Sequence, residues 1–275
     1  MDSLVSTDWL ADHLGEVLVI DASWQMSATG RNGREEYLQS HIPGARFLDI
    51  DALSDRQNPA PHMLPGADLF VGAMEELGIG SSDPIVVYDN SPLRTAARGW
   101  FMLRHFGAEK VGILDGGFQK WTAEGRPVES GETERRSARF DPQQRRGEVI
   151  TKQDILCGNH EPLLDARRKA RFEGIESDPR PGVESGHIPG ARNLPFSALY
   201  REDGRFKPVD EIRRLFSEAG MDPERPFVAS CGSGVTANSL IFAAHLLGND
   251  SAQLYDGSWS EWGADPATPK ALGPA

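Results

Sequence analysis

The chain contains 275 residues, of which 39% are hydrophobic and 25% charged, and its formal net charge is −12 at pH 7. This composition is typical of a soluble globular protein, and the length suits one large domain or two of ordinary size. The strongly negative charge argues against nucleic-acid binding, which needs a basic surface.

The N-terminal stretch MDSLVSTDWLADHLG has no basic segment followed by an apolar block, so we expect neither a signal peptide nor a transit peptide. No apolar run approaches the roughly 20 residues that a membrane-spanning helix requires. The two cysteines, Cys157 and Cys231, are too few for a disulfide framework, and no C-x-x-C or H-E-x-x-H spacing indicates a metal site. We therefore expect a cytoplasmic protein without metal, cofactor or membrane partner, in which a free thiol persists.

Four segments of the first half return, in the same order, in the second half. LVIDAS (18–23) returns as LLDAR (163–167), HIPGAR (41–46) as HIPGAR (187–192), VVYDNSPLRTAA (86–97) as FVASCGSGVTAN (227–238), and LDGGFQKW (114–121) as LYDGSWSEW (254–262). A repeat of this length predicts two homologous domains and not a solenoid of short units.

Between the repeats lies the segment Glu129–Glu148, in which half of the residues are charged. Phe140 is its only large apolar residue, so the segment has little to bury and we interpret it as a surface linker. The predicted domains are then residues 1–128 and 149–275.

The second half alternates short apolar runs with helical patterns. We expect strands at 162–166, 226–230 and 251–255, and helices at 209–220, 234–248 and 258–262. This alternation predicts an α/β fold in which each domain is a mostly parallel sheet with helices on both faces. Because reactive sites of such sheets lie at the carboxyl ends of the strands, the position of Cys231 directly after a strand is that of a site.

The loop CGSG leads from Cys231 into a helix that we expect to begin near Val235. The free N–H groups and positive dipole end of that helix favour an anion. Gly232 and Gly234 allow successive backbone N–H groups to turn inward and form an anion-binding nest. Such a loop would hold Cys231 as a thiolate.

Two other interpretations of Cys231 fit its neighbours less well than a reactive thiolate. An inert core cysteine, the usual fate of an unpaired cysteine, would have apolar neighbours, whereas GSG follows here. A phosphatase cradle needs C-x5-R, and Ala237 stands where the arginine would be. Ser233 and Thr236 add uncharged hydroxyl groups to the loop, which favours the reactive thiolate.

The duplicated domain, the HIPGA segments, the strand–Cys–loop–helix unit and LYDGSWSEW together resemble the rhodanese-type sulfurtransferases over nearly the whole chain. The loop CGSGVTA is similar to that of members using mercaptopyruvate, whereas thiosulfate-preferring members carry a basic loop such as CRKGVTA. The resemblance implies that Cys231 takes sulfur from a small-molecule donor, mercaptopyruvate, as a persulfide and releases pyruvate. The sulfur would pass to a thiol acceptor, such as thioredoxin or a small thiol, or to cyanide. Gly232, Gly234, Val235 and Thr236 would line the donor site.

The same resemblance assigns further residues to the site. Arg171 and Arg180 match the two arginines that hold the donor, and planar guanidinium groups suit its carboxylate. Asp51 and His62 match a segment of the first domain that reaches the site, where they would form a proton relay with Ser233.

Asn90 occupies the position of Cys231 in the first repeat and cannot form a persulfide, so we expect a catalytically silent first domain. Two alternatives remain at this point. One is a thiosulfate:cyanide sulfurtransferase with the same nucleophile, and the other is a non-catalytic sulfur carrier or binding module on the same scaffold.

Overall fold

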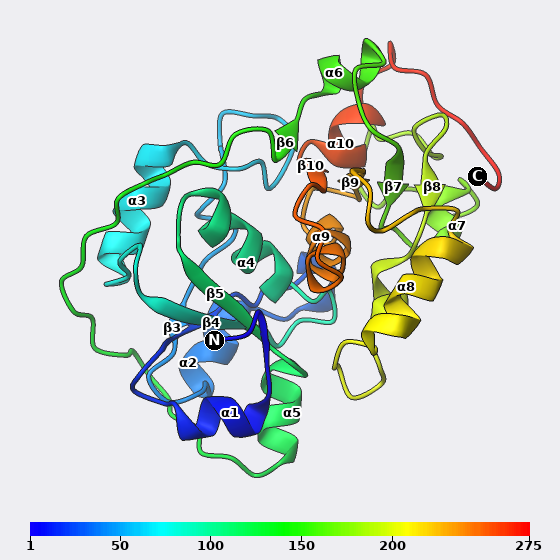
Figure 1. Cartoon of the computed structure of the whole chain (residues 1–275). Coiled ribbons are helices and arrows are strands. Elements are labelled where there is room, and N and C mark those ends of the chain that lie inside the picture. Colours follow the sequence, from blue (N-terminus) through cyan, green and yellow to red (C-terminus); the bar gives the residue numbers. More distant parts are fainter. The chain divides into compact units, whose positions relative to one another are not determined.

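A computed structural model describes residues 1–275 of the chain (Figure 1). The backbone forms two compact units. Unit 1 comprises Met1–Ser54, Leu64–Arg145 and Arg201–Phe206, and unit 2 comprises Asp55–Met63, Arg146–Tyr200 and Lys207–Ala275. Each unit therefore includes one short segment from the opposite half of the sequence.

Unit 1 contains five strands, five α-helices and a 3-10 helix, η1. In chain order these are β1 (Leu4–Val5), α1 (Thr7–Asp12), β2 (Leu18–Asp21), η1 (Ser27–Thr29), α2 (Gly33–Gln39), β3 (Arg46–Phe47), α3 (Ala67–Glu76), β4 (Pro84–Tyr88), α4 (Ala96–His105), β5 (Lys110–Leu114) and α5 (Gly117–Ala123).

Unit 2 repeats this arrangement with five strands, five α-helices and the 3-10 helix η2. They are β6 (Val149–Ile150), α6 (Lys152–Leu156), β7 (Leu163–Asp165), α7 (Lys169–Phe172), β8 (Arg192–Asn193), η2 (Phe196–Leu199), α8 (Val209–Glu218), β9 (Val228–Ser230), α9 (Ala237–Leu246), β10 (Gln253–Tyr255) and α10 (Ser258–Trp262). No helix of the structure has the length and apolarity needed to cross a membrane.

The two sheets have the same topology. Their strand orders are β1-β5-β4-β2-β3 and β6-β10-β9-β7-β8, and every strand pair is parallel. Each strand of unit 1 thus has a counterpart at the same place in unit 2. The predicted duplication and parallel α/β architecture are confirmed.

Burial explains the apolar runs from which the strands were predicted. Strand β9 is buried throughout, and the chain is apolar from Pro226 to Ala229 because a parallel sheet is covered on both faces. Helix α9, which packs on β9 and β10 (Figure 1), is buried over most of its surface and apolar nearly all round. It begins at Ala237, slightly later than Val235, since Gly234 adopts a left-handed φ of 71° before it.

The segment interpreted as a linker runs along unit 1 as far as Arg145. Glu129 forms a β-bridge with His41, and Phe140 is 2% exposed and packs edge-on against Phe70. Its charged residues are mostly exposed. One aromatic anchor, a few backbone bonds, and ion pairs such as those of Arg135 with Glu76 and Arg136 with Asp83 hold this polar stretch on unit 1.

Candidate active site

Cys231 follows the last residue of β9 and is 1% exposed. The six-residue loop from Cys231 to Thr236 connects it to α9. The buried Asn238 stabilises this loop, because its Nδ2 donates to the carbonyl oxygens of Gly234, at 2.6 Å, and Val235, at 2.9 Å. The sulfur thus lies at the carboxyl edge of the sheet, on a loop held by its own helix.

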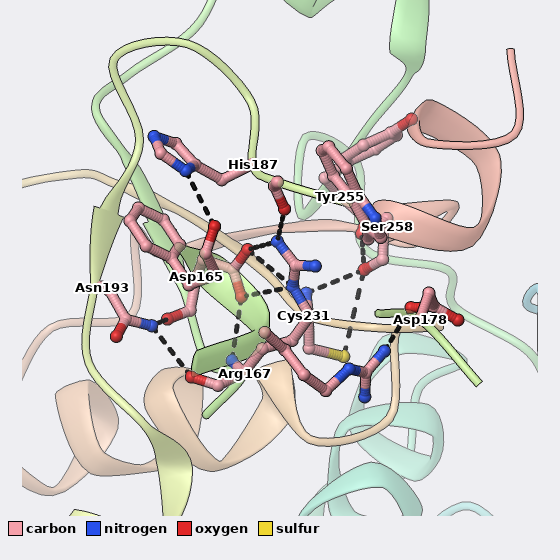
Figure 2. Close-up of polar contacts among 12 residues, drawn as sticks. Asp165, Arg167, Asp178, His187, Asn193, Cys231, Tyr255 and Ser258 are labelled. Carbon is pink, nitrogen blue, oxygen red and sulfur yellow. Dashed lines mark hydrogen bonds and ion pairs between the residues drawn. The ribbon is translucent and has the colours of Figure 1, made fainter. Parts of the chain in front are cut away.

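Ser258, which sequence reasoning did not single out, contacts the loop at its base. Its Oγ accepts the N–H groups of Cys231, at 3.0 Å, and Gly234, at 3.1 Å, donates to the carbonyl of Tyr255, and lies 4.0 Å from Cys231 Sγ (Figure 2). Its φ is 49°, a conformation that a residue with a side chain adopts at a cost of about 1–3 kcal/mol. The counterpart in the first repeat is Gly117, at φ 58°. The equivalent segments read LDGG (114–117) and YDGS (255–258). The change from glycine to serine at their last position is a sequence signal that could have revealed Ser258.

Helix α10 determines which way the loop faces. The backbone N–H groups of Trp259 and Ser260 donate to the carbonyls of Cys231, at 3.0 Å, and Gly232, at 2.8 Å. The N–H groups of Ser233, Val235 and Thr236 have no partner within the protein. The loop therefore has its first carbonyls occupied and several N–H donors left to bind an anion.

Two arginines lie beside the loop. A Cβ placed on Gly232 would be 3.4 Å from Arg180 Nη1 and 3.7 Å from Arg171 Nη2. Both guanidinium groups pair with the carboxylate of Asp178, whose side chain is 1% exposed. The structure thus brings Arg171 and Arg180 to the residue next to Cys231, and Asp178 is a partner that sequence reasoning missed.

His62 belongs to unit 2 although it comes from the first half of the sequence. Its Nδ1 lies 2.8 Å from Ser233 Oγ, and both side chains are buried. Its backbone has a φ of 62°, which is uncommon for a residue other than glycine. Asp51 belongs to unit 1, where its carboxylate accepts the indole N–H of Trp24 at 2.8 Å.

A buried ion pair supports the neighbouring strand. Arg167 forms a bidentate pair with Asp165 at the end of β7, donates to the carbonyl of Gly186, and lies over the ring of Trp259 at 4.6 Å (Figure 2). Both charged side chains are 2% exposed. The backbone N–H of Trp259 also donates to the carbonyl of Cys231. The Asp165–Arg167 ion pair therefore supports the base of the loop through Trp259.

The second cysteine lies in a different environment. Cys157 is exposed at the end of α6, and its sulfur accepts from the side chain of Gln153 at 3.2 Å. No group of three or more His, Cys, Asp or Glu side chains is arranged to hold a metal ion. The features of a reactive centre therefore gather around Cys231.

Comparison with known proteins agrees with this geometry. The profile of the Rhodanese-like domain family matches residues 6–124 and 150–265. The chain belongs to the rhodanese family. It is 44% identical to the 3-mercaptopyruvate sulfurtransferase of Escherichia coli K12, over 94% of each chain, and 42% identical to that of Homo sapiens, over 94% of this chain and 91% of the human one. The crystal structure of SseA, a 3-mercaptopyruvate sulfotransferase from Escherichia coli, superposes with a TM-score of 0.85 at 41% identity, covering 95% of this chain and all of SseA.

In the first rhodanese-like domain, the position of the nucleophile is filled by a hydrogen-bond network. The carbonyl of Asn90 accepts from Gln25 and Arg31, both at 3.0 Å, and its side-chain amide donates to Glu36 at 3.3 Å. Arg31 and Glu36 also form an ion pair. The loop is thus occupied by side chains of its own domain and has no sulfur.

The first domain also lacks the buried ion pair. Asp21, at the end of β2, is the counterpart of Asp165, but Ser23 stands two residues later where unit 2 has Arg167. Without that cation, burial raises the pKa of the Asp21 carboxyl to about 7. Both differences set this rhodanese-like domain apart from the one that carries Cys231.

Proposed function

We propose that the chain is a 3-mercaptopyruvate sulfurtransferase, with Cys231 as nucleophile, Arg171 and Arg180 as the donor-binding arginines, and a catalytically silent first domain. The observation that carries the proposal is the placement of two guanidinium groups within 4 Å of the Gly232 Cβ position, next to the sulfur. The loop itself, CGSGVTA, contains no cation. The positive charge therefore comes from Arg171 and Arg180 beside the loop. The carboxylate of the substrate can pair with them while the sulfur of the substrate faces the thiol of Cys231.

The donor would be bound by directed hydrogen bonds. Guanidinium groups bind a carboxylate through paired N–H donors. Arg171 Nε is buried and has no hydrogen-bond partner within the protein, so a bound carboxylate would satisfy it. The loop residues Gly232, Gly234, Val235 and Thr236 would surround the sulfur of the donor.

In the first half-reaction the Cys231 thiolate attacks the sulfur of mercaptopyruvate. An S–S bond forms, and the C–S bond breaks with its electron pair going to carbon, which gives the enolate of pyruvate and a protonated Cys231 persulfide. The enolate takes a proton at carbon and leaves as pyruvate, while the persulfide loses its proton to become an anion. The partnerless N–H groups of the loop would stabilise that anion.

His62 and Ser233 would move the proton. The contact of 2.8 Å between His62 Nδ1 and Ser233 Oγ is short enough for transfer through the hydroxyl. An imidazole ring has one nitrogen that can accept a proton and one that can donate, so His62 can both take and return the proton. Asp51 is the proposed third member of this relay.

In the second half-reaction a nucleophile would attack the outer sulfur of the persulfide and regenerate the Cys231 thiolate. A protein thiol such as that of thioredoxin, a small thiol, or cyanide can each perform this displacement. Because the cycle needs a free thiol between turnovers, we infer that the protein works in a reducing compartment such as the cytoplasm.

The donor assignment is tested by steady-state kinetics with one acceptor and two donors. The value of kcat/KM should be at least about tenfold higher for mercaptopyruvate than for thiosulfate. Two arginines paired with one carboxylate leave one positive charge, which balances the single charge of mercaptopyruvate but leaves thiosulfate with an unbalanced charge beside the thiolate. A higher kcat/KM for thiosulfate would replace the proposal by a thiosulfate:cyanide sulfurtransferase.

Replacing His62 should separate the two donors. Asparagine tolerates a left-handed backbone and can still bond to Ser233, but it cannot titrate. His62→Asn should slow persulfide formation from mercaptopyruvate about 100-fold and from thiosulfate less than about threefold, because only mercaptopyruvate leaves as an enolate. Single-turnover measurements of pyruvate and sulfite release check this, with the partly exposed His160→Asn as control. Equal losses with both donors would remove His62 from the relay.

A further inference from the structure

We propose that Asp178 determines donor specificity, because it positions both donor-binding arginines and cancels one of their two charges. The inference rests on the proposed function, since it concerns the charge presented to the donor of Cys231. The loop CGSGVTA contains no charged residue, and the two arginines alone would carry two positive charges. Only with the carboxylate of Asp178 does the site have a single net positive charge.

The geometry makes Asp178 a shared partner. One carboxylate oxygen pairs with Arg171 Nη2, and the other accepts from Arg180 Nη1 at 3.3 Å and from the backbone N–H of Arg180 at 3.0 Å. The carboxylate side chain is 1% exposed, whereas the arginine side chains are 16% and 29% exposed. The anion is therefore enclosed, and the two cations extend from it toward Gly232.

A buried carboxylate is stable only while its partners remain in place. Asp178 thus holds two flexible side chains in one arrangement, and it lowers the entropy lost when a donor binds. It also sets the local charge. Two guanidinium groups and one carboxylate leave one net positive charge beside the sulfur.

That single charge discriminates between donors. Mercaptopyruvate carries one negative charge on its carboxylate, and thiosulfate carries two. A site with one net positive charge neutralises mercaptopyruvate. It leaves bound thiosulfate with one unbalanced negative charge close to the Cys231 thiolate. Removing the negative charge of Asp178 would double the positive charge and favour the dianion.

The first test compares donors in Asp178→Asn. Asparagine has nearly the same shape and can still accept the Arg180 N–H. The ratio of kcat/KM for thiosulfate to kcat/KM for mercaptopyruvate should rise about tenfold relative to the unmodified protein. Glu176→Gln is the matched control, because it removes the same charge two residues away, where Glu176 pairs with the exposed Arg168. That ratio should stay within about twofold in the control.

The second test does not depend on either donor. In a Cys157→Ser background, the rates at which iodoacetate and iodoacetamide alkylate Cys231 are measured by mass spectrometry. The reagents differ by one negative charge, so Asp178→Asn should raise the iodoacetate-to-iodoacetamide ratio several-fold, and Asp178→Glu should leave it near its original value. Added salt should reduce the difference.

The ratio of the two kcat/KM values does not depend on the fraction of active protein, so it remains valid if Asp178→Asn is only partly folded. An unchanged alkylation ratio, or an equal change in Glu176→Gln, would overturn the role of Asp178. If the unmodified protein prefers thiosulfate, the donor assignment fails, but the alkylation ratio still tests the charge at the site.

Discussion

Cys231→Ser should abolish sulfur transfer, lowering kcat at least about 10⁴-fold, because a serine hydroxyl cannot form a persulfide. Incubation of the unmodified protein with mercaptopyruvate should add about 32 Da, one sulfur atom, to its intact mass. The adduct should be absent in Cys231→Ser. Serine is close in size to cysteine and keeps the backbone N–H that binds Ser258, so the variant should fold normally.

Cys157→Ser is the control, since Cys157 is the other cysteine and lies exposed at the end of α6. It should retain both the adduct and the activity. An adduct that persists in Cys231→Ser would place the nucleophile elsewhere. If neither mercaptopyruvate nor thiosulfate adds mass to the unmodified protein, a non-catalytic binding module becomes the better interpretation.

Gly234→Ala should have the second-largest effect. A Cβ at this position would meet the carbonyl oxygen and the Oδ1 of Asp256 at 2.6 Å, and the backbone φ of 71° disfavours any residue with a side chain. The loop must move, which breaks the 3.1 Å bond from the Gly234 N–H to Ser258. We expect a loss of about 1–3 kcal/mol in the free energy of unfolding and a decrease of about 100-fold in the rate of persulfide formation.

The control for Gly234→Ala is Gly190→Ala. Gly190 has a φ of 82° in the HIPGA turn of the same unit, and a Cβ there would meet nothing within 4 Å. This variant carries the strain without the clash, so its kcat should be unchanged and its thermal stability only slightly lower. If Gly234→Ala and Gly190→Ala behave alike in chemical denaturation and in persulfide formation, the loop tolerates the methyl group and the argument from close packing is wrong.

The two units share a fold and differ around the position of Cys231. Both sheets have the same strand order, so the core was retained. In the first copy Asn90 replaces the sulfur, and Gly117 stands where the second copy has the hydroxyl of Ser258. The aligned loops, NSPLRT (90–95) and CGSGVT (231–236), share only their last residue, although each connects the equivalent strand to the equivalent helix.

Short-range sequence patterns were sufficient to predict much of the fold of this protein. The repetition of four segments, the apolar runs and the helical periods predicted two parallel α/β domains, and the structure confirms them. The position of Cys231 after a strand, before a glycine-containing loop and a helix, was also evident. Arg171, Arg180 and His62 were proposed only because their surroundings resemble a family.

The tertiary structure alone supplied the partners of these residues. Asp178 looks like any polar loop residue in the sequence, yet it is buried between two arginines. Ser258 holds the base of the Cys231 loop, and Arg167 braces the strand beside it. Asp178 and Arg167 carry no such signal, and only the exchange of the glycine of the first repeat for serine in the second marked Ser258 in the sequence.

By itself, then, the sequence determined the duplicated α/β fold and singled out Cys231 as the proposed nucleophile, because strand and helix periodicity and the order of neighbouring residues are local properties of the chain. Only the tertiary structure decided which side chains meet at the sulfur. His62 and Ser233 are 171 residues apart and contact each other at 2.8 Å. Such contacts depend on how the whole chain packs and on which buried polar groups must be paired, and neither leaves a regular pattern in the sequence.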